Sequence, residues 1–421
     1  MRNKIEFDMI TESTNNHIPQ LRFPEFQNDG EWSFVHGKEL FEPIVNKNHN
    51  SDLPVLAITQ DQGAVPRDMI DYNVIVSDKS IAGYKVVEVG DFIISLRSFQ
   101  GGIEYSHYKG LCSPAYIVLR KRNEIVCNEF YRYYFKSARF IQDLNRNLEG
   151  IRDGKMISYQ QFSAIIIPFP PLAEQRRIAA CLLALDEMLA ATNDKLEQLK
   201  AYKKGLMQKL FPAKGKTLPE YRFKEFEKDG EWKVKKLEEI AEKITTKNKT
   251  NKKNPVLTNS AIEGIINQQD YFDREIVTKD NLMNYYLIEL DDFVYNPRIS
   301  NAAPVGPISR NKNGKGIMSP LYIIFRFKKG DIDFYEHYFR TSCWHQYLKN
   351  KANFGARFDR MNITNEDFLD MPLPFPLLAE QQRIASVLSE FDAMLSATKD
   401  KLEQLKAYKK GLMQGMFINN I

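Results

Sequence analysis

Six histidines and four cysteines are the residues of this chain whose spacing would mark a zinc centre or a disulfide framework. They form neither an HExxH pattern nor a CxxC pair, so their spacing indicates no zinc centre and no disulfide framework. We expect the cysteines to pack as small buried hydrophobic residues: Cys112, Cys127, Cys181 and Cys343. We expect the histidines at the surface or in ordinary packing: His17, His36, His49, His107, His337 and His345.

Three short motifs resemble fragments of catalytic sites, and each lacks a required residue. Gly-Lys-Thr at 215–217 ends like a phosphate-binding P-loop, but Leu210 stands where the first glycine is needed. Tyr-Asn-Pro-Arg at 295–298 lacks the second proline and the aromatic residue of the amino-methyltransferase motif, and no glycine-rich cofactor loop precedes it. Asp-Gly-Glu-Trp-Lys at 229–233 contains the Glu-x-Lys of metal-dependent nucleases, but the chain's other Asp-Gly-Glu-Trp is followed by Ser33. We therefore expect no catalytic site.

The length and composition are those of a globular protein with two domains. A chain of 421 residues exceeds one ordinary core, and 43% hydrophobic residues supply a core for each half. The net charge of +5 permits a polyanionic partner through local patches without requiring one. Residues 1–16 form a polar leader without the apolar core of a secretory signal, and no apolar run approaches about 18 residues. We expect a cytoplasmic protein with no membrane partner.

The chain is an internal duplication. Residues 194–208 and 400–414 both read DKLEQLKAYKKGLMQ. Further matches follow in the same order along both halves: LRFPEFQNDGEW with YRFKEFEKDGEW, GDFIIS with DDFVYN, SPAYIVLR with SPLYIIFR, FYRYYFKS with FYEHYFRT, and PFPPLAEQRRIA with PFPLLAEQQRIA. Between these landmarks the halves differ widely. Two copies that share these landmarks and differ between them favour one kind of domain adapted to two different targets. Neutral drift after duplication is the alternative.

Each half ends in a predicted long helix, residues 172–211 and residues 378–417. Apolar residues recur there at alternating steps of four and three, which is typical of a helix packed against another helix. Each helix follows a proline and has a glutamate in its first turn. The first seam comprises Ile178, Leu182, Leu185, Leu189, Leu196, Leu199, Leu206 and Leu210, with Thr192 and Lys203 at its polar places. The second comprises Ile384, Leu388, Phe391, Leu395, Leu402, Leu405, Leu412 and Met416, with Thr398 and Lys409 at the same places.

The order domain, helix, domain, helix predicts that the two helices pack against each other in opposite directions. The linker at residues 212–220 is short, so the first helix must run to the second domain and the second helix must return. The pair would be an antiparallel coiled coil with pseudo-twofold symmetry, about 50 Å long. Major-groove sites on one face of DNA recur about every 34 Å, so this rod could place two readers on two half-sites. A coiled coil that only stabilises or dimerises the protein is the alternative.

The two domains, residues 17–171 and 221–377, are predicted to be α+β. Runs of β-branched and aromatic residues between turn signals indicate strands: PVLAIT, NVIVSD, YKVVEVGDFIIS, AYIVLR, YYLIELDDFVYN and LYIIFRF. Residues 129–144 and 333–348 carry aromatic residues on one face and are predicted to be helical. Each half is thus expected to be a mixed α/β domain followed by its long helix.

Polar loops with basic residues and glycines interrupt these elements in both halves. Lys and Arg contact phosphates at any sequence, whereas Arg, Asn, Gln and Ser can read base edges, so such loops suit sequence-specific DNA binding. Several basic residues occupy comparable places in the two halves, although a solvated surface charge is the alternative for each. The predicted DNA-binding residues are Arg97, Arg152, Lys155, Lys252, Lys253, Arg298, Arg357 and Arg360.

These landmarks resemble the specificity subunits of type I restriction and modification systems, and the resemblance covers nearly the whole chain. It rests on the duplicated segment that begins RFPEF and ends DGEW, on the IPFPPLAEQRRIA and MPLPFPLLAEQQRIA junctions, and on the KLEQLKAYKKGLMQ tails. The resemblance implies two tandem target recognition domains joined by two antiparallel helices. Each domain would read one half of an asymmetric, bipartite sequence in double-stranded DNA. It implies no role for residues 1–16.

The same resemblance implies that the missing catalytic residues reside on partner subunits. The helices would dock two modification subunits, which methylate adenine using S-adenosylmethionine, and the full assembly would add two restriction subunits that use ATP and Mg. No cofactor and no enzymatic activity are then expected on this chain. Two other hypotheses remain: a duplicated coiled-coil adaptor that joins proteins without reading DNA, and a self-contained nuclease, for which the sequence supplies no residues.

Overall fold

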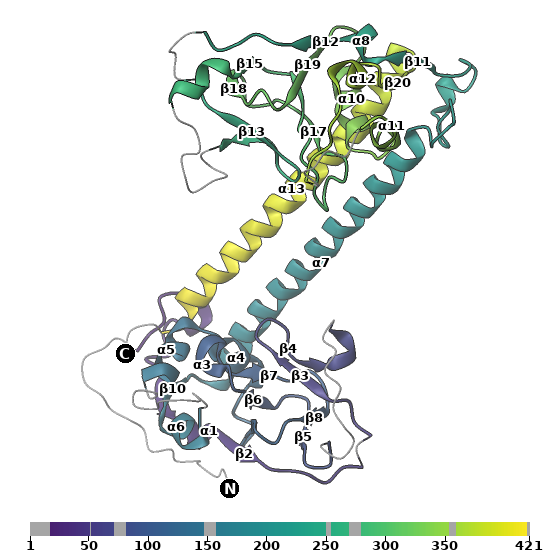
Figure 1. Ribbon diagram of the computed structural model, residues 1–421. Helices are drawn as coiled ribbons and strands as arrows, with labels where there is room; N and C mark the ends of the chain where they lie inside the picture. Colours follow the sequence, from purple (N-terminus) through teal and green to yellow (C-terminus); the bar gives the residue numbers. More distant parts are fainter. Residues whose placement is uncertain are drawn as a thin grey trace. The chain divides into compact units, whose positions relative to one another are not determined.

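The computed structural model describes residues 17–50, 52–70, 81–146, 157–249, 254–268, 279–352 and 359–418. The chain divides into two compact units, Met1–Asn193 with Asp400–Ile421, and Asp194–Lys399. Each unit therefore holds one mixed α/β domain, the first part of one long helix and the last part of the other (Figure 1). Within the described ranges, no helix is long and apolar enough to cross a lipid bilayer.

The described strands of the first unit pair antiparallel, as short connections permit. Its central sheet has the order β2 (Phe41–Ile44), β9 (Ile117–Lys121), β6 (Phe92–Ile94) and β7 (Glu104–Tyr105). Two-stranded pairs are β1 (Ser33–His36) with β10 (Ile166–Phe169), β3 (Leu56–Thr59) with β4 (Gly63–Pro66), and β5 (Lys85–Val87) with β8 (Gly110–Cys112). The shorter helices are η1 (Pro24–Phe26), α1 (Gly37–Leu40), η2 (Arg67–Met69), α3 (Ser98–Gly101), α4 (Asn128–Tyr134), α5 (Ala138–Arg146) and α6 (Tyr159–Ala164).

The second unit repeats this arrangement, which confirms the mixed α/β class predicted for both halves. Its central sheet has the order β12 (Ala241–Ile244), β19 (Ile323–Phe327), β16 (Phe293–Tyr295) and β17 (Ile308–Arg310). Two-stranded pairs are β11 (Lys233–Lys236) with β20 (Pro372–Phe375), β13 (Leu257–Ser260) with β14 (Gly264–Asn267), and β15 (Tyr286–Ile288) with β18 (Gly316–Met318). The shorter helices are η3 (Lys224–Phe226), α8 (Leu237–Ile240), η4 (Lys279–Asn284), α10 (Ile332–Phe339), α11 (His345–Lys351) and α12 (Asn365–Leu369).

Aromatic side chains fill the centre of each core. In the first unit, Phe41, Phe92 and Phe135 are fully buried, and their ring centroids lie 5.0 to 5.4 Å apart. Such ring pairs stabilise a core beyond the area that they bury. Trp32 and Trp232, one near the start of each domain, are also buried.

The segment predicted as one helix at residues 129–144 is two helices separated by a turn. α4 ends at Tyr134, and the Ser137 hydroxyl accepts a hydrogen bond from the Phe140 amide at 3.2 Å, which caps the start of α5. In the turn between them, Lys136 donates from Nζ to the Glu104 carboxylate at 2.5 Å. Residues 333–348 of the second unit are divided in the same way, into α10 and α11.

The two long helices, α7 (Leu172–Leu210) and α13 (Leu378–Met416), contain 39 residues each. Every residue of the two predicted seams is buried or half-buried. At the polar places, the hydroxyls of Thr192 and Thr398 donate to the carbonyls of Met188 and Met394, each at 2.7 Å. The seams therefore face protein along both helices.

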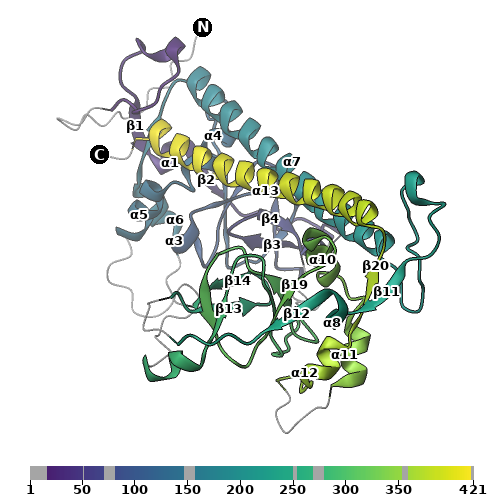
Figure 2. The same ribbon diagram turned by 90° about the horizontal axis from the view of Figure 1, so that it is seen from above.

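In the first unit, the start of α7 packs against the end of α13. Ile178 and Met416 belong to the same hydrophobic core, and further along α7 the Asp186 carboxylate pairs with Lys409. As residue numbers rise along α7, those of the partners on α13 fall. The two helix segments of this unit therefore run antiparallel (Figures 1 and 2).

The second unit contains the same arrangement with the helices exchanged. Here Leu210 shares a core with Ile384, and Lys203 pairs with Asp392. The lysine at a polar place of one helix thus meets an aspartate of the other helix in both units. Since these ion pairs repeat with the sequence, each unit carries its own copy of the antiparallel contact.

A buried ion pair ties each domain to the first turn of its own long helix. In the first unit, the Arg22 guanidinium donates twice to the Glu174 carboxylate, both times at 2.8 Å, and the side chains are 4% and 1% exposed. In the second unit, Arg222 and Glu380 form the same pair of 2.8 Å hydrogen bonds. Loss of either partner would leave a buried charge uncompensated, so these pairs fix where each helix leaves its domain.

One contact between a domain and its long helix differs between the two units. His337 of α10 is 3% exposed and shares a hydrogen bond with Ser389 at 3.1 Å, while its Nδ1 atom has no hydrogen-bond partner in the described residues. Burial, with the nearby cations of Lys203 and Arg340, lowers the pKa of His337 to about 4 from 6.5. At the matching place in the first unit, the Tyr133 hydroxyl instead donates to a carboxylate at 2.6 Å.

We expect His337→Tyr to remove part of the acid sensitivity of the second unit. Between pH 6.5 and 4 this histidine is protonated in the unfolded chain and neutral in the folded chain. The contribution of His337 to the free energy of unfolding is therefore complete above pH 6.5 and is lost as the pH falls toward 4. From about pH 7 to about 4.5 the loss from this group is about 2 kcal/mol, which the tyrosine variant would not suffer. Urea unfolding at several pH values would measure it. The control is Tyr133→Phe, whose curve should parallel the wild type; parallel curves for His337→Tyr would contradict the expectation.

Candidate nucleic-acid interface

Arg97 lies in an exposed turn of the first unit, three residues after the end of β6. Its amide donates to the Ser95 hydroxyl at 3.2 Å, and its carbonyl accepts from the Gln60 side chain at 3.4 Å. The buried Ser98 hydroxyl accepts from the Ser95 amide at 2.9 Å. These bonds hold the backbone and leave the guanidinium in solvent, as a group that contacts DNA requires.

A buried glutamate and a half-buried lysine support this turn. Lys136 donates to the backbone carbonyls of Gln60 and Gly101, at 3.1 and 2.9 Å, as well as to Glu104. Burial raises the pKa of Glu104 to about 7, although Lys136 opposes the shift. Lys136 thus joins the β3–β4 turn to the turn that carries Arg97, so both are positioned together.

Arg298 and Arg360 lie together in the second unit. Arg298 follows β16 by three residues, as Arg97 follows β6, and it forms an isolated antiparallel bridge with Arg360. Backbone hydrogen bonds on either side hold the two segments: Ile299 donates to the Asp359 carbonyl at 3.0 Å, and Met361 donates to Pro297 at 2.9 Å. The bridge therefore joins two predicted DNA-contacting residues that are far apart in the sequence.

The Asp359 carboxylate lies between the two guanidinium groups, 3.9 Å from each. The Arg298 and Asp359 side chains are more than half exposed, and Arg360 is 31% exposed. Exposed pairs at this distance contribute little to stability. Both arginines can therefore exchange Asp359 for a phosphate or a base edge.

A glycine with positive φ makes each arginine-bearing loop possible. Gly102 has φ +82°, and a Cβ there would lie 1.9 Å from the Phe135 carbonyl oxygen. Gly306 has φ +81°, and a Cβ there would lie 2.0 Å from the Asn296 carbonyl oxygen. Any other residue would displace backbone, so the two loops pack closely on their domains at matching glycines.

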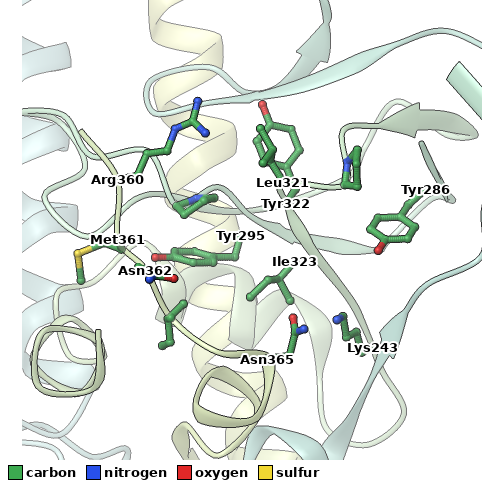
Figure 3. Close-up of a pocket in the computed structure, with 13 residues that line it drawn as sticks. Lys243, Tyr286, Tyr295, Leu321, Tyr322, Ile323, Arg360, Met361, Asn362 and Asn365 are labelled. Atoms are coloured by element: carbon green, nitrogen blue, oxygen red, sulfur yellow. The ribbon is translucent and has the colours of Figure 1, made fainter. Parts of the chain in front are cut away.

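The other predicted DNA-binding residues fall outside the described ranges: Arg152, Lys155, Lys252, Lys253 and Arg357. The described residues place Arg298 with Arg360 in the second unit and Arg97 in the first. Beside Arg360 lies a cavity that the sequence did not predict (Figure 3). The repeat contains one signal of a difference at this place, because Asn365 at the edge of the cavity aligns with Tyr159 of the first half.

The fold and the loops define a class: a protein with two tandem mixed α/β domains, each presenting basic loops and each followed by a long helix. A family model for the type I restriction modification DNA specificity domain matches residues 31–201 and again residues 229–407. The chain therefore belongs to the family of type I restriction-modification specificity subunits. The role of this family is DNA sequence specificity.

Two relatives agree with this assignment, and one solved structure shares the fold. The type I restriction enzyme MjaVIII specificity subunit of Methanocaldococcus jannaschii is 24% identical, with 80% of each chain covered. The putative type I restriction enzyme MjaX specificity subunit of the same organism is 26% identical, over 93% of this chain and 94% of that protein. The S subunit of the type I system of M. genitalium shares the fold with a TM-score of 0.52 and 15% identity, over 96% of this chain and 100% of that one.

Proposed function

We propose that each unit reads one half of a bipartite sequence in double-stranded DNA. The observation that carries the proposal is the matched position of Arg97 and Arg298, each exposed and three residues beyond equivalent strands, on loops whose sequences differ. Equal placement gives the two units the same approach to a duplex. Different loop sequences give them different base preferences.

The long helices would set the distance between the half-sites. A helix of 39 residues is about 58 Å long, well over one turn of DNA. α7 and α13 each continue without a break from one unit into the other. Because two antiparallel helices are stiffer than one linker, they would restrict the gap between the bases that are read.

The identical segments of the two helices would each dock one methyltransferase subunit. Residues 194–208 and 400–414 share every side chain, and Tyr202 and Tyr408 within them are 63% and 59% exposed. A methyltransferase subunit that fits one segment would therefore fit the other, because both segments present the same side chains. Methylation with S-adenosylmethionine, and ATP- and Mg-dependent restriction, would then reside on the partner subunits and not on this chain.

Arg298→Ala and Arg360→Ala are each expected to relax sequence preference in one half-site only, and in the same half-site. Loss of a base or phosphate contact costs about 1–3 kcal/mol, a weakening of roughly tenfold or more. Arg97→Ala should relax the other half-site. Mapping methylated adenines genome-wide, in cells that carry each variant with its methyltransferase, would measure the preference at every position.

Arg298→Lys is the matched control, because it keeps the charge and loses the bidentate geometry. A phosphate contact should survive this change and a base contact should not. Unaltered methylation sites in all three alanine variants would contradict the loop assignment. A complex of this subunit and the methyltransferase with no preference among duplexes would favour the adaptor hypothesis instead.

A further inference from the structure

The second unit contains a cavity of about 440 Å³ at one end of its central sheet (Figure 3). Strands β12, β15 and β16 contribute Lys243, Tyr286 and Tyr295 to its lining. Pro297, residues 320–323 up to the start of β19, and the segment at 360–365 contribute the rest. The volume falls in the range of about 300–1,000 Å³ that small-molecule sites occupy.

Two cations line the cavity, and in the described part of the chain only Arg360 has a carboxylate within ion-pair distance. Lys243 is half-buried, and burial alone lowers its pKa, with no neighbouring charge to oppose the shift. Arg360 reaches Asp359 only at 3.9 Å. The two lie at opposite ends of the lining, with Asn365 toward the Lys243 end (Figure 3). A half-buried ammonium without a counter-ion is costly, and a bound acceptor would offset that cost.

Aromatic rings and free amides form the remaining polar lining. The hydroxyls of Tyr295 and Tyr322 are bonded elsewhere, to the Val305 carbonyl at 2.9 Å and to a threonine hydroxyl at 3.0 Å. Tyr295 is also fully buried and stacks on Phe368, so of these two only the half-buried Tyr322 offers the cavity ring surface. The side-chain amides of Asn362 and Asn365 bond to no described residue and remain available. Rings that stack and amides that donate and accept are what proteins use to hold a nucleobase.

The first unit fills the matching positions with its own contacts. Tyr159 stands in place of Asn365, and its hydroxyl donates to the Phe41 carbonyl at 3.0 Å. Lys85 stands in place of Tyr286, and its ammonium donates to a backbone carbonyl at 2.6 Å. The groups that the second unit leaves open to a ligand are therefore not required by the shared fold.

We propose that this cavity binds one nucleotide, with the phosphate at Arg360 and the base beside the half-buried rings of Tyr286 and Tyr322, its edge toward Asn365 and Lys243. The nucleotide can come from two sources. One is an unstacked base of the half-site that the second unit reads, and for this source the inference rests on the proposed function. A free mononucleotide is the other source. Arg360 connects the cavity to Arg298 through their backbone bridge, so DNA held by Arg298 would bring a nucleotide within reach.

Two titrations of the complex of this subunit with its methyltransferase distinguish the sources. The first uses duplexes in which 2-aminopurine replaces single bases of that half-site, because its fluorescence rises when the base leaves the stack. The second titrates the complex with deoxynucleoside monophosphates and measures their binding by calorimetry. We expect a severalfold rise in fluorescence at one position, or saturable mononucleotide binding. In Lys243→Ala and in Asn365→Tyr, which installs the residue of the first unit, the fluorescence rise should be lost and the mononucleotide affinity should fall at least tenfold.

Tyr159→Phe, at the matching place in the first unit, is the control and should leave both signals unchanged. Circular dichroism would show that each variant folds. If Asn365→Tyr does not fold, Lys243→Ala still tests the cavity, because it removes no core packing. Signals that survive both cavity variants would overturn the assignment. Absence of both signals in a complex that still prefers its sequence would overturn this inference alone. Absence of any sequence preference would instead overturn the proposed function.

Discussion

Deleting one heptad from both long helices is expected to shorten the preferred gap between the half-sites by about three base pairs. Seven helical residues span about 10 Å, and a base pair of duplex DNA rises about 3.4 Å. Seven residues are also within about 20° of two full turns, so the seam keeps facing its partner. The bases read within each half-site should not change, because the loops that carry Arg97 and Arg298 are untouched.

The deletions that best preserve the helix contacts are residues 191–197 and residues 397–403. They lie between the two lysine–aspartate pairs, so Lys203 with Asp392 and Lys409 with Asp186 both remain. Three base pairs also turn one half-site by roughly 100° about the duplex axis, so affinity for even the best gap should fall. Methylation mapping against a library of gap lengths would measure both effects.

Deletion from α7 alone is the control, because the shortened α7 cannot keep both of its ion pairs with an intact α13. That variant should lose activity at all gaps. A double deletion that methylates the original gap with unchanged preference would contradict the role of the helices as a spacer. In that case the gap would have to be set by the partner subunits.

The long helices could be predicted from the sequence because an apolar seam that repeats over many turns is specific to a long helix packed against protein. The mixed α/β class followed from short β-branched runs and aromatic helices. The turn that separates α4 from α5 was missed, because no glycine or proline marks residues 135–137. The break coincides instead with Ser137, whose hydroxyl caps the start of α5.

Contacts between distant residues could not be read from local pattern. Arg22 and Glu174 are 152 positions apart, and neither carries a signal of burial by itself. The repeat does carry one, since an arginine and a glutamate recur at both places in the second half. The cavity was harder to foresee, because separate segments of the chain line it and its polar groups differ from those of the first half.

Tyr202→Glu and Tyr408→Glu are each expected to remove one methyltransferase subunit from the complex, and the double variant both. A glutamate in an exposed aromatic contact leaves a charge to be buried, which typically costs several kcal/mol, a weakening of more than about a hundredfold. Native mass spectrometry would count the subunits directly. Glu197→Ala and Glu403→Ala, more than half exposed and away from the tyrosines on the helix surface, are the controls and should retain both copies.

Two glycines on the same helix face make the docking hypothesis separable from a structural effect. Gly205 and Gly411 follow the tyrosines by three residues, and a Cβ at either would meet no atom within 4 Å. The fold of this chain does not need them, although each costs a helix about 1 kcal/mol relative to alanine. Gly205→Leu and Gly411→Leu should therefore raise helix stability and still weaken methyltransferase binding, because a side chain keeps the partner backbone away. If binding and stability rise together, the tyrosine–glycine face is not the docking surface.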